Sequence, residues 1–185
     1  MTDTPRLEQA EIRAAQQNRA AFAPLYQRYA DAVYGYCLRR LSDPEQAADT
    51  TAEVFTKALT TIGRFRGSSF RSWLFAIARN AVIDRYRARK PVGELPDTLV
   101  SPQPGPEDIA IRRETSLELR TALTHLTEQQ QDVITLRLAG LTGKEIAAAM
   151  DMTHGAVKAT QVRAFARLRE LMAPLMEMQK EGDRV

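Results

Sequence analysis

Residues 64–90 of the sequence, RFRGSSFRSWLFAIARNAVIDRYRARK, combine dense positive charge with aromatic side chains. Eight of these residues are basic, and only Asp84 is acidic. From Phe70 onward the apolar residues recur at helical spacing, which predicts a helix with one apolar face. Residues 64–69 interrupt this period with Gly67 and two serines, so they predict a loop in which Ser68 or Ser69 caps the helix.

This loop and helix admit two interpretations. Cations neutralise phosphates and exposed aromatic rings stack on unpaired bases, so the stretch is suited to single-stranded or melted nucleic acid. A core aromatic helix with a solvated basic face is the simpler interpretation of the stretch taken alone. The remainder of the chain has to decide between them.

Composition bounds the class of protein. The chain has 185 residues, of which 44% are hydrophobic and 26% charged, as expected for one ordinary or two small globular domains. The net charge is only +3, so the clustering of basic residues says more than their number. No apolar run approaches the roughly 20 residues of a membrane span. The N-terminus lacks the apolar core of a signal peptide, and we expect a cytoplasmic protein without membrane insertion.

Residues for catalysis or metal binding are not apparent. Cys37 is the only cysteine, which excludes an intrachain disulfide and a cysteine metal cage. His125 and His154 lie far apart with no metal-ligand spacing about either, and no Gly-rich phosphate loop is present. We therefore expect no enzyme activity, no cofactor and no metal.

The periodicity predicts an all-α fold with two small helical domains, the second a helix-turn-helix. Prolines crowd residues 91–107, which predicts a linker. The expected divisions are a polar N-terminal segment (1–17), a first domain (18–90), the linker (91–107), a second domain (108–175) and a tail (176–185).

The first domain is expected to contain three or four helices. A weak period covers residues 6–20, and a broad apolar face that includes Cys37 covers 22–41. Asp43 as N-cap and Pro44 at the first helical position begin the next helix, and Gly63 ends it. Its expected apolar face consists of Ala48, Thr51, Ala52, Phe55, Ala58, Leu59 and Ile62. Trp73 is expected near the centre of the core.

In the second domain a helix over 109–126 precedes several local signals. Capping-box spacing occurs at Thr127–Gln130 and at Thr142–Glu145, and Gly140 suits the left-handed end of a helix. A short helix to Met150, a turn at 151–153 and a basic helix from Thr153 to about residue 172 form a helix-turn-helix pattern. The last helix is expected to bury Val157, Gln161, Ala164, Phe165 and Leu168. An ordinary helical hairpin is the alternative.

Taken together, the segments FAPLYQRYADAVYGYCLRRL, PEQAADTTAEVFTKAL, FRGSSFRSWLFAIARNAVIDRYR and LTEQQQDVITLRLAGLTGKEIAAAMDMTHGAVKATQVRAFARLREL resemble the extracytoplasmic-function (group IV) sigma factors of bacterial RNA polymerase. The resemblance covers about residues 20–172, with both domains in the family's order. It implies a first domain that docks on the clamp of the largest polymerase subunit and captures the melted minus-ten element. The second domain would bind the minus-thirty-five element and the flap of the second-largest subunit.

The resemblance also implies three sets of site residues. The minus-ten set, with arginines on phosphates and Asn80 on a flipped base, is Phe65, Arg66, Ser68, Ser69, Phe70, Arg71, Trp73, Arg79 and Asn80. The minus-thirty-five set is Thr142, Lys144, Lys158, Ala159, Thr160, Val162, Arg163 and Arg167. The polymerase-binding set is Asp49, Thr51, Glu53 and Val54. Many relatives have Gln at Ala52 and Ser-Arg at Ala159-Thr160, so these contacts differ in this chain.

An alternative sigma factor is the function that the resemblance implies, with core RNA polymerase and promoter DNA as partners. Anti-sigma factors are common in the family, and the sequence leaves the presence of one open. The main alternative is a helix-turn-helix regulator that acts without core polymerase; a protein-binding adaptor and a nucleic-acid-modifying enzyme rank below it. One further hypothesis is that the two domains pack together in the free protein and hide both DNA surfaces.

Overall fold

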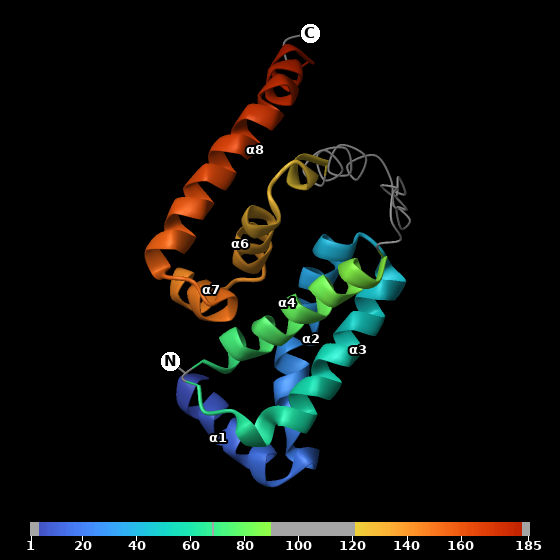
Figure 1. The fold of residues 1–185 in the computed structure, drawn as a ribbon, viewed down its shortest axis with the longest axis vertical. Helices are drawn as coiled ribbons and strands as arrows, with labels where there is room; N and C mark the ends of the chain where they lie inside the picture. Colours follow the sequence, from blue (N-terminus) through green and yellow to red (C-terminus); the bar gives the residue numbers. More distant parts are fainter. Residues whose placement is uncertain (1–3, 68, 90–120, 183–185) are drawn as a thin grey trace.

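The computed structural model describes residues 4–67, 69–89 and 121–182, with side chains for 6–67, 69–88 and 121–173. Within these ranges the chain is helical and contains no strand, which confirms the all-α prediction (Figure 1). The elements are α1 (Thr4–Gln17), η1 (Arg19–Phe22), α2 (Ala23–Leu41), α3 (Pro44–Thr61), η2 (Ile62–Arg64), α4 (Phe70–Arg89), α6 (Glu128–Leu138), α7 (Gly143–Met150) and α8 (His154–Gly182). The linker 91–107, most of the predicted helix 109–126 and Ser68 lie outside the described residues.

In the first half of the chain α2, α3 and α4 pack against one another. Their interior is aromatic: the rings of Tyr36 and Phe75 meet edge to face at 5.8 Å, and Phe70 is also buried in it. Cys37 is fully buried, as predicted. The expectation of Trp73 at the centre of this core is wrong, because Trp73 is only partly buried and lies against its edge.

The buried face of α3 is turned from the predicted one. Ala48 and Ala52 are exposed, whereas Ala47, Thr50 and Val54 are fully buried. Thr51 and Phe55 are buried under both arrangements. The prediction failed because α3 is rich in alanine and threonine, whose small side chains give little hydrophobic contrast between neighbouring faces.

Most predicted caps are present. The Asp43 side chain accepts a hydrogen bond from the Gln46 N–H, with Pro44 following as first helical residue. Ser69 Oγ accepts from the Ser72 N–H at the start of α4. Both capping boxes form, at Thr127–Gln130 and Thr142–Glu145. These side chains satisfy backbone donors that a helix N-terminus otherwise leaves unpaired.

The helix-turn-helix forms as predicted from α7, a short turn and α8. Asp151 adopts the left-handed conformation with φ of +52°, and Thr153 Oγ accepts from the Ala156 N–H. Gly140 is also left-handed, at φ +85°. The helix α8 continues to Gly182, so the expected end near residue 172 is wrong.

The two halves pack on each other, which confirms the first part of the packing hypothesis, that the domains lie together in the free protein. One hydrophobic cluster runs from the first half into α6 and α7 and joins Leu74 and Phe75 with Val133, Leu136 and Ile146. The helix α4 contacts α7, and α2 contacts α6. In Figure 1, α4 accordingly lies across the middle, with α3 on one side, α7 on the other and α2 crossing behind it.

Candidate nucleic-acid and polymerase interfaces

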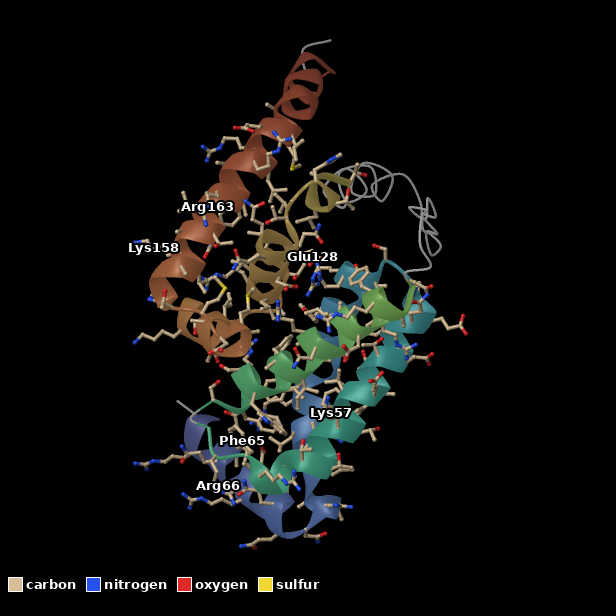
Figure 2. The ribbon with its side chains drawn as sticks, in the orientation of Figure 1. Lys57, Phe65, Arg66, Glu128, Lys158 and Arg163 are labelled. Carbon is tan, nitrogen blue, oxygen red and sulfur yellow. The ribbon has the colours of Figure 1, made fainter. Side chains whose placement is uncertain are left out.

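One face of α8 displays most of the residues predicted to read the minus-thirty-five element. We call Lys158, Ala159, Val162, Arg163 and Arg167 the reading face. All five are exposed, Val162 by 62%. Figure 2 shows Lys158 directed into solvent, with Arg163 further along the same helix. The second part of the packing hypothesis, that both DNA surfaces are hidden in the free protein, is wrong for this surface, because the first half leaves it exposed.

Two residues of α8 exchange the places expected for them. Thr160 was predicted to read DNA, but it is 2% exposed, so it cannot contact a base in this arrangement. Phe165 was predicted to be buried, but it is 48% exposed and follows Val162 by three residues, which places both on the same side of the helix. Aromatic and aliphatic groups contact thymine methyls, so Phe165 is a candidate reader that the sequence interpretation missed.

The N-terminus of α7 is accessible in part. Thr142 is exposed and Lys144 is exposed, as a phosphate contact requires. The Glu145 carboxylate accepts from the Thr142 N–H at 2.8 Å, and its other oxygen accepts from Ser69 Oγ in the first half at 3.4 Å. Ser69 therefore contacts the second half of the chain, although it was predicted to contact DNA.

The predicted minus-ten loop is folded onto its own aromatic rings. Phe65 and Phe70 are buried, and Phe65 packs on Phe70 and Trp73 with ring centroids 5.8 and 5.2 Å apart. Both phenylalanines belong to the predicted minus-ten set, but neither ring is available for stacking on bases in this arrangement, because the core of the first half covers them. Gly67 closes over the ring: a Cβ placed there would lie 2.9 Å from Phe65 Cε2.

Three polar side chains of the minus-ten set differ in availability. Arg66 is exposed, and its Nη1 donates to the carbonyls of Gly63 and Phe65, each at 2.8 Å. Asn80 is exposed on α4. Arg71, in contrast, donates through Nη2 to the Ala139 carbonyl in the second half at 2.8 Å.

Arg79 is held in a buried charge cluster between the halves. Its Nε lies 2.7 Å from Asp132 Oδ2, and Arg40 Nε lies 3.3 Å from Asp132 Oδ1. The side chains of Asp132 and Arg40 are 2% and 4% exposed. Arg40 also donates to Gln131 and lies over the Tyr86 ring, 5.5 Å from its centroid.

The charges of this cluster affect one further side chain. Burial raises the pKa of the Tyr36 phenol well above its usual range, and the negative charge of Asp132 adds to the effect. Sequence reasoning missed Arg40 and Asp132; the local signal was an aspartate directly before the apolar residues of α6, which begin at Val133. A buried carboxylate with two arginine partners is costly to leave unpaired.

The predicted polymerase-binding set divides by exposure. Asp49 and Glu53 are exposed one turn apart on α3, with Ala52 between them, and Glu53 forms an exposed ion pair with Arg85 at 3.7 Å. Thr51 and Val54 are buried. Val54 therefore supports α3 from inside and offers no surface to a partner in this arrangement.

Two other properties bear on function. Within the described residues no cluster of three or more histidine, cysteine, aspartate or glutamate side chains is arranged to hold a metal ion. No helix in that part of the chain combines the length and the apolar character needed to cross a membrane.

Comparison with known proteins identifies both halves. Residues 25–92 match the family model for Sigma-70 region 2, and residues 116–168 match that for Sigma-70, region 4. Among solved structures, that of CnrH in complex with the cytosolic domain of CnrY aligns with a TM-score of 0.70 and 24% identity, over 89% of this chain and 96% of CnrH. RpoE of Bartonella quintana, in complex with the anti-sigma factor NepR, aligns with a TM-score of 0.64 and 23% identity, over 82% and 96% of the two chains. These two likenesses support the fold.

Curated relatives support the family over nearly the whole chain. The sigma factor BldN of Streptomyces coelicolor is 36% identical over 92% of this chain and 67% of BldN. SigD of Mycobacterium tuberculosis is 31% identical over 89% of this chain and 83% of SigD. A regulator that acts without core polymerase is not favoured by these relatives. The chain belongs to the extracytoplasmic-function sigma factors and is an alternative sigma factor that directs RNA polymerase.

Proposed function

We propose that this sigma factor recognises promoters through two surfaces, the reading face of α8 and the Arg66–Asn80 region of the first half. The observation that carries the proposal is the helix-turn-helix with an exposed basic reading face. Its second helix is the element that enters the major groove in proteins of this kind. Arg163 is long enough for paired contacts to a guanine edge, Lys158 offers an exposed cation for a neighbouring phosphate, and Val162 is suited to a thymine methyl.

The second surface would capture the melted minus-ten strand. Arg66 offers an exposed cation for a phosphate, and the Asn80 amide can donate to and accept from the edge of an unpaired base. Opening each base-pair step costs about 1–2 kcal/mol of stacking, which such contacts would offset. We expect no chemistry from the sigma factor itself.

Use of the whole minus-ten set requires the two halves to separate. Arg79 cannot neutralise a phosphate while its guanidinium is paired with Asp132, and Arg71 is likewise bound to Ala139. The described arrangement is therefore a closed form. We propose that docking on core polymerase, with the halves on different subunits, opens it.

The proposed partners follow from the same surfaces. Asp49 and Glu53 on α3 would meet the clamp of core RNA polymerase, promoter DNA would meet the two DNA surfaces, and the protein would act in the cytoplasm. An anti-sigma factor is a further expected partner, as NepR is for RpoE of Bartonella quintana.

Reconstitution with bacterial core polymerase tests the proposal. Co-elution on gel filtration and a discrete start site in run-off transcription, beginning with the DNA upstream of the gene itself, are the expected results. Asn80→Ala should still bind core polymerase but lose open complex, while Gln27→Ala, an exposed amide on α2, should match the wild type. Failure of the wild-type protein to bind core polymerase would refute the proposal.

A further inference from the structure

The N-terminal helix α1 is part of the first half and contacts the predicted minus-ten loop. Ile12 and Ala15 are buried in the shared core. Arg28 on α2 pairs with Glu11 at 2.8 Å, and the Tyr29 hydroxyl donates to Glu8. The polar N-terminal segment predicted from the sequence is thus an ordered helix from Thr4 to Gln17, fastened to α2 by two acidic side chains.

The last turn of α1 places Gln16 against the turn that begins the loop. Its Nε2 donates to two carbonyls, those of Ile62 at 3.2 Å and Phe65 at 3.0 Å. These carbonyls bracket η2, since the Phe65 N–H itself donates to the Ile62 carbonyl at 2.9 Å. An amide NH₂ group has two hydrogens, so one side chain can satisfy both acceptors. Gln16 therefore ties together the two ends of the turn.

Phe65 connects the turn that Gln16 holds to the predicted minus-ten loop. Gln16 holds the Phe65 carbonyl from one side, and Arg66 Nη1 donates to the same oxygen at 2.8 Å. The Phe65 ring is packed on Phe70 and Trp73 and covered by Gly67. The backbone and ring of Phe65 are thus both fixed, and the guanidinium of Arg66 is oriented by the same carbonyl that Gln16 holds.

We propose that Gln16 is a positioning residue for promoter recognition: it pre-organises the 62–66 turn, and through the Phe65 carbonyl it sets the direction of Arg66 and of the loop that follows. This inference rests on the proposed function of the loop in strand capture. A loop held in its bound conformation before DNA arrives loses less conformational entropy on binding. Gln16 touches no base; it acts through the turn.

The decisive variant is Gln16→Met in the full-length protein. Methionine keeps the length and the helix preference of glutamine but cannot donate a hydrogen bond. Gln16→Glu adds a carboxylate that faces two carbonyls. Gln17→Ala, at the exposed neighbouring amide, is the matched control. Each variant is assembled with core polymerase and assayed on a template library whose minus-ten positions are randomised, with the transcripts sequenced.

We expect Gln16→Met to co-elute with core polymerase as the wild type does, and to show a flattened base preference at one or two minus-ten positions. Transcript yield should fall about fivefold to tenfold, because the two hydrogen bonds that Gln16 adds to the turn are lost. Gln16→Glu should be more affected, and Gln17→Ala unchanged. A wild-type base preference in Gln16→Met would overturn the inference, whether yield is unchanged or falls together with thermal stability. If the wild type itself neither bound core polymerase nor gave transcripts, the proposed function would fail first, and the inference with it.

Discussion

Arg79 Nε lies 2.7 Å from Asp132 Oδ2, so a side chain predicted to hold promoter phosphate is bound instead by the other half of its own chain. The two residues are 53 positions apart in the sequence. Arg40 binds the second oxygen of the same carboxylate. This pairing links domain arrangement to DNA binding, because the free Arg79 guanidinium and the closed form exclude each other.

We expect Asp132→Asn to favour separation of the two halves. The substitution keeps the shape of the side chain but leaves Arg40 buried without a counter-charge, and breaking such a pair costs about 3–5 kcal/mol. Small-angle scattering should give a larger radius of gyration for the variant, and its thermal midpoint should fall. Glu170→Gln is the control, since the Arg167–Glu170 pair is exposed and such pairs contribute at most about 1 kcal/mol. An unchanged radius of gyration in Asp132→Asn would argue that the ion pairs of Asp132 with Arg40 and Arg79 do not hold the two halves together.

On the reading face, Arg163→Ala should relax base preference at the minus-thirty-five element. A paired contact from arginine to guanine contributes about 1–3 kcal/mol of discrimination. Lys158→Ala should instead reduce the salt dependence of binding by a slope of about 1 if its partner is a phosphate. Holoenzyme binding to duplex fragments at several salt concentrations measures both. Arg169→Ala, exposed further along α8, is the comparison, and an equal effect there would remove the special role of Arg163.

Phe165→Ala provides a separate test on α8. Its ring is 48% exposed, so its loss should cost little folding stability and should weaken binding to sites that carry a thymine at the contacted position. Thr160→Val replaces a side chain that is 2% exposed with one of nearly equal shape. Because Thr160 reaches the reading face only through a long hydrogen bond that Arg163 Nη2 donates to its hydroxyl at 3.4 Å, the substitution should alter base preference less than Phe165→Ala does. A change of preference in Thr160→Val alone would reverse the assignment of these two residues.

On α3 the expected effects separate binding from folding. Asp49→Ala should weaken association with core polymerase at unchanged stability, because the carboxylate is exposed. Val54→Ala should destabilise the fold by about 2 kcal/mol, since its side chain is fully buried. Gel filtration with core polymerase and denaturant unfolding measure the two quantities. A stable Val54→Ala protein that fails to bind polymerase would show that Val54 becomes a contact after rearrangement.

We expect the buried thiol of Cys37 to make the free energy of unfolding fall at high pH. Burial raises the pKa of its thiol from 9.0 to about 11, so the folded state disfavours the thiolate that the unfolded chain forms freely. The stabilisation is complete below pH 9 and is lost as the pH rises towards 11. Denaturant unfolding at about pH 8 and about pH 10.5, on either side of the unfolded-state value, should therefore show a steeper loss in the wild type than in Cys37→Ala. Equal losses in the two proteins would mean that the buried thiol is not the source of the pH dependence.

Local chemistry made much of the fold predictable. Asp43, Thr142 and Thr153 act through hydrogen bonds to N–H groups three residues away, and such signals are complete within a short stretch of sequence. The order of the helices and the helix-turn-helix followed from the same kind of signal together with apolar periodicity.

Which side of a helix is buried was less predictable. On α8, Thr160 and Phe165 exchanged their expected environments because packing against α6 and α7 decides the buried side, and residue type alone favoured the reverse. The Asp132 cluster and the Gln16 contacts join residues that are at least 46 positions apart, for which a single sequence carries no local pattern.

The position of α4 between the two halves has a consequence for measured affinities. In the proposed open form, the contacts of α4 with α2 and α3 would persist, whereas its contacts with α7 would be lost. If only the open form binds polymerase, the apparent dissociation constant equals the intrinsic one divided by the open fraction. A substitution that weakens the contacts between α4 and α7, at a residue that touches neither DNA nor polymerase, would raise the open fraction. It would thereby strengthen apparent polymerase binding. When several sigma factors compete for a limited supply of core enzyme, the packing of α4 on α7 would help to set the share of core enzyme that this sigma factor binds.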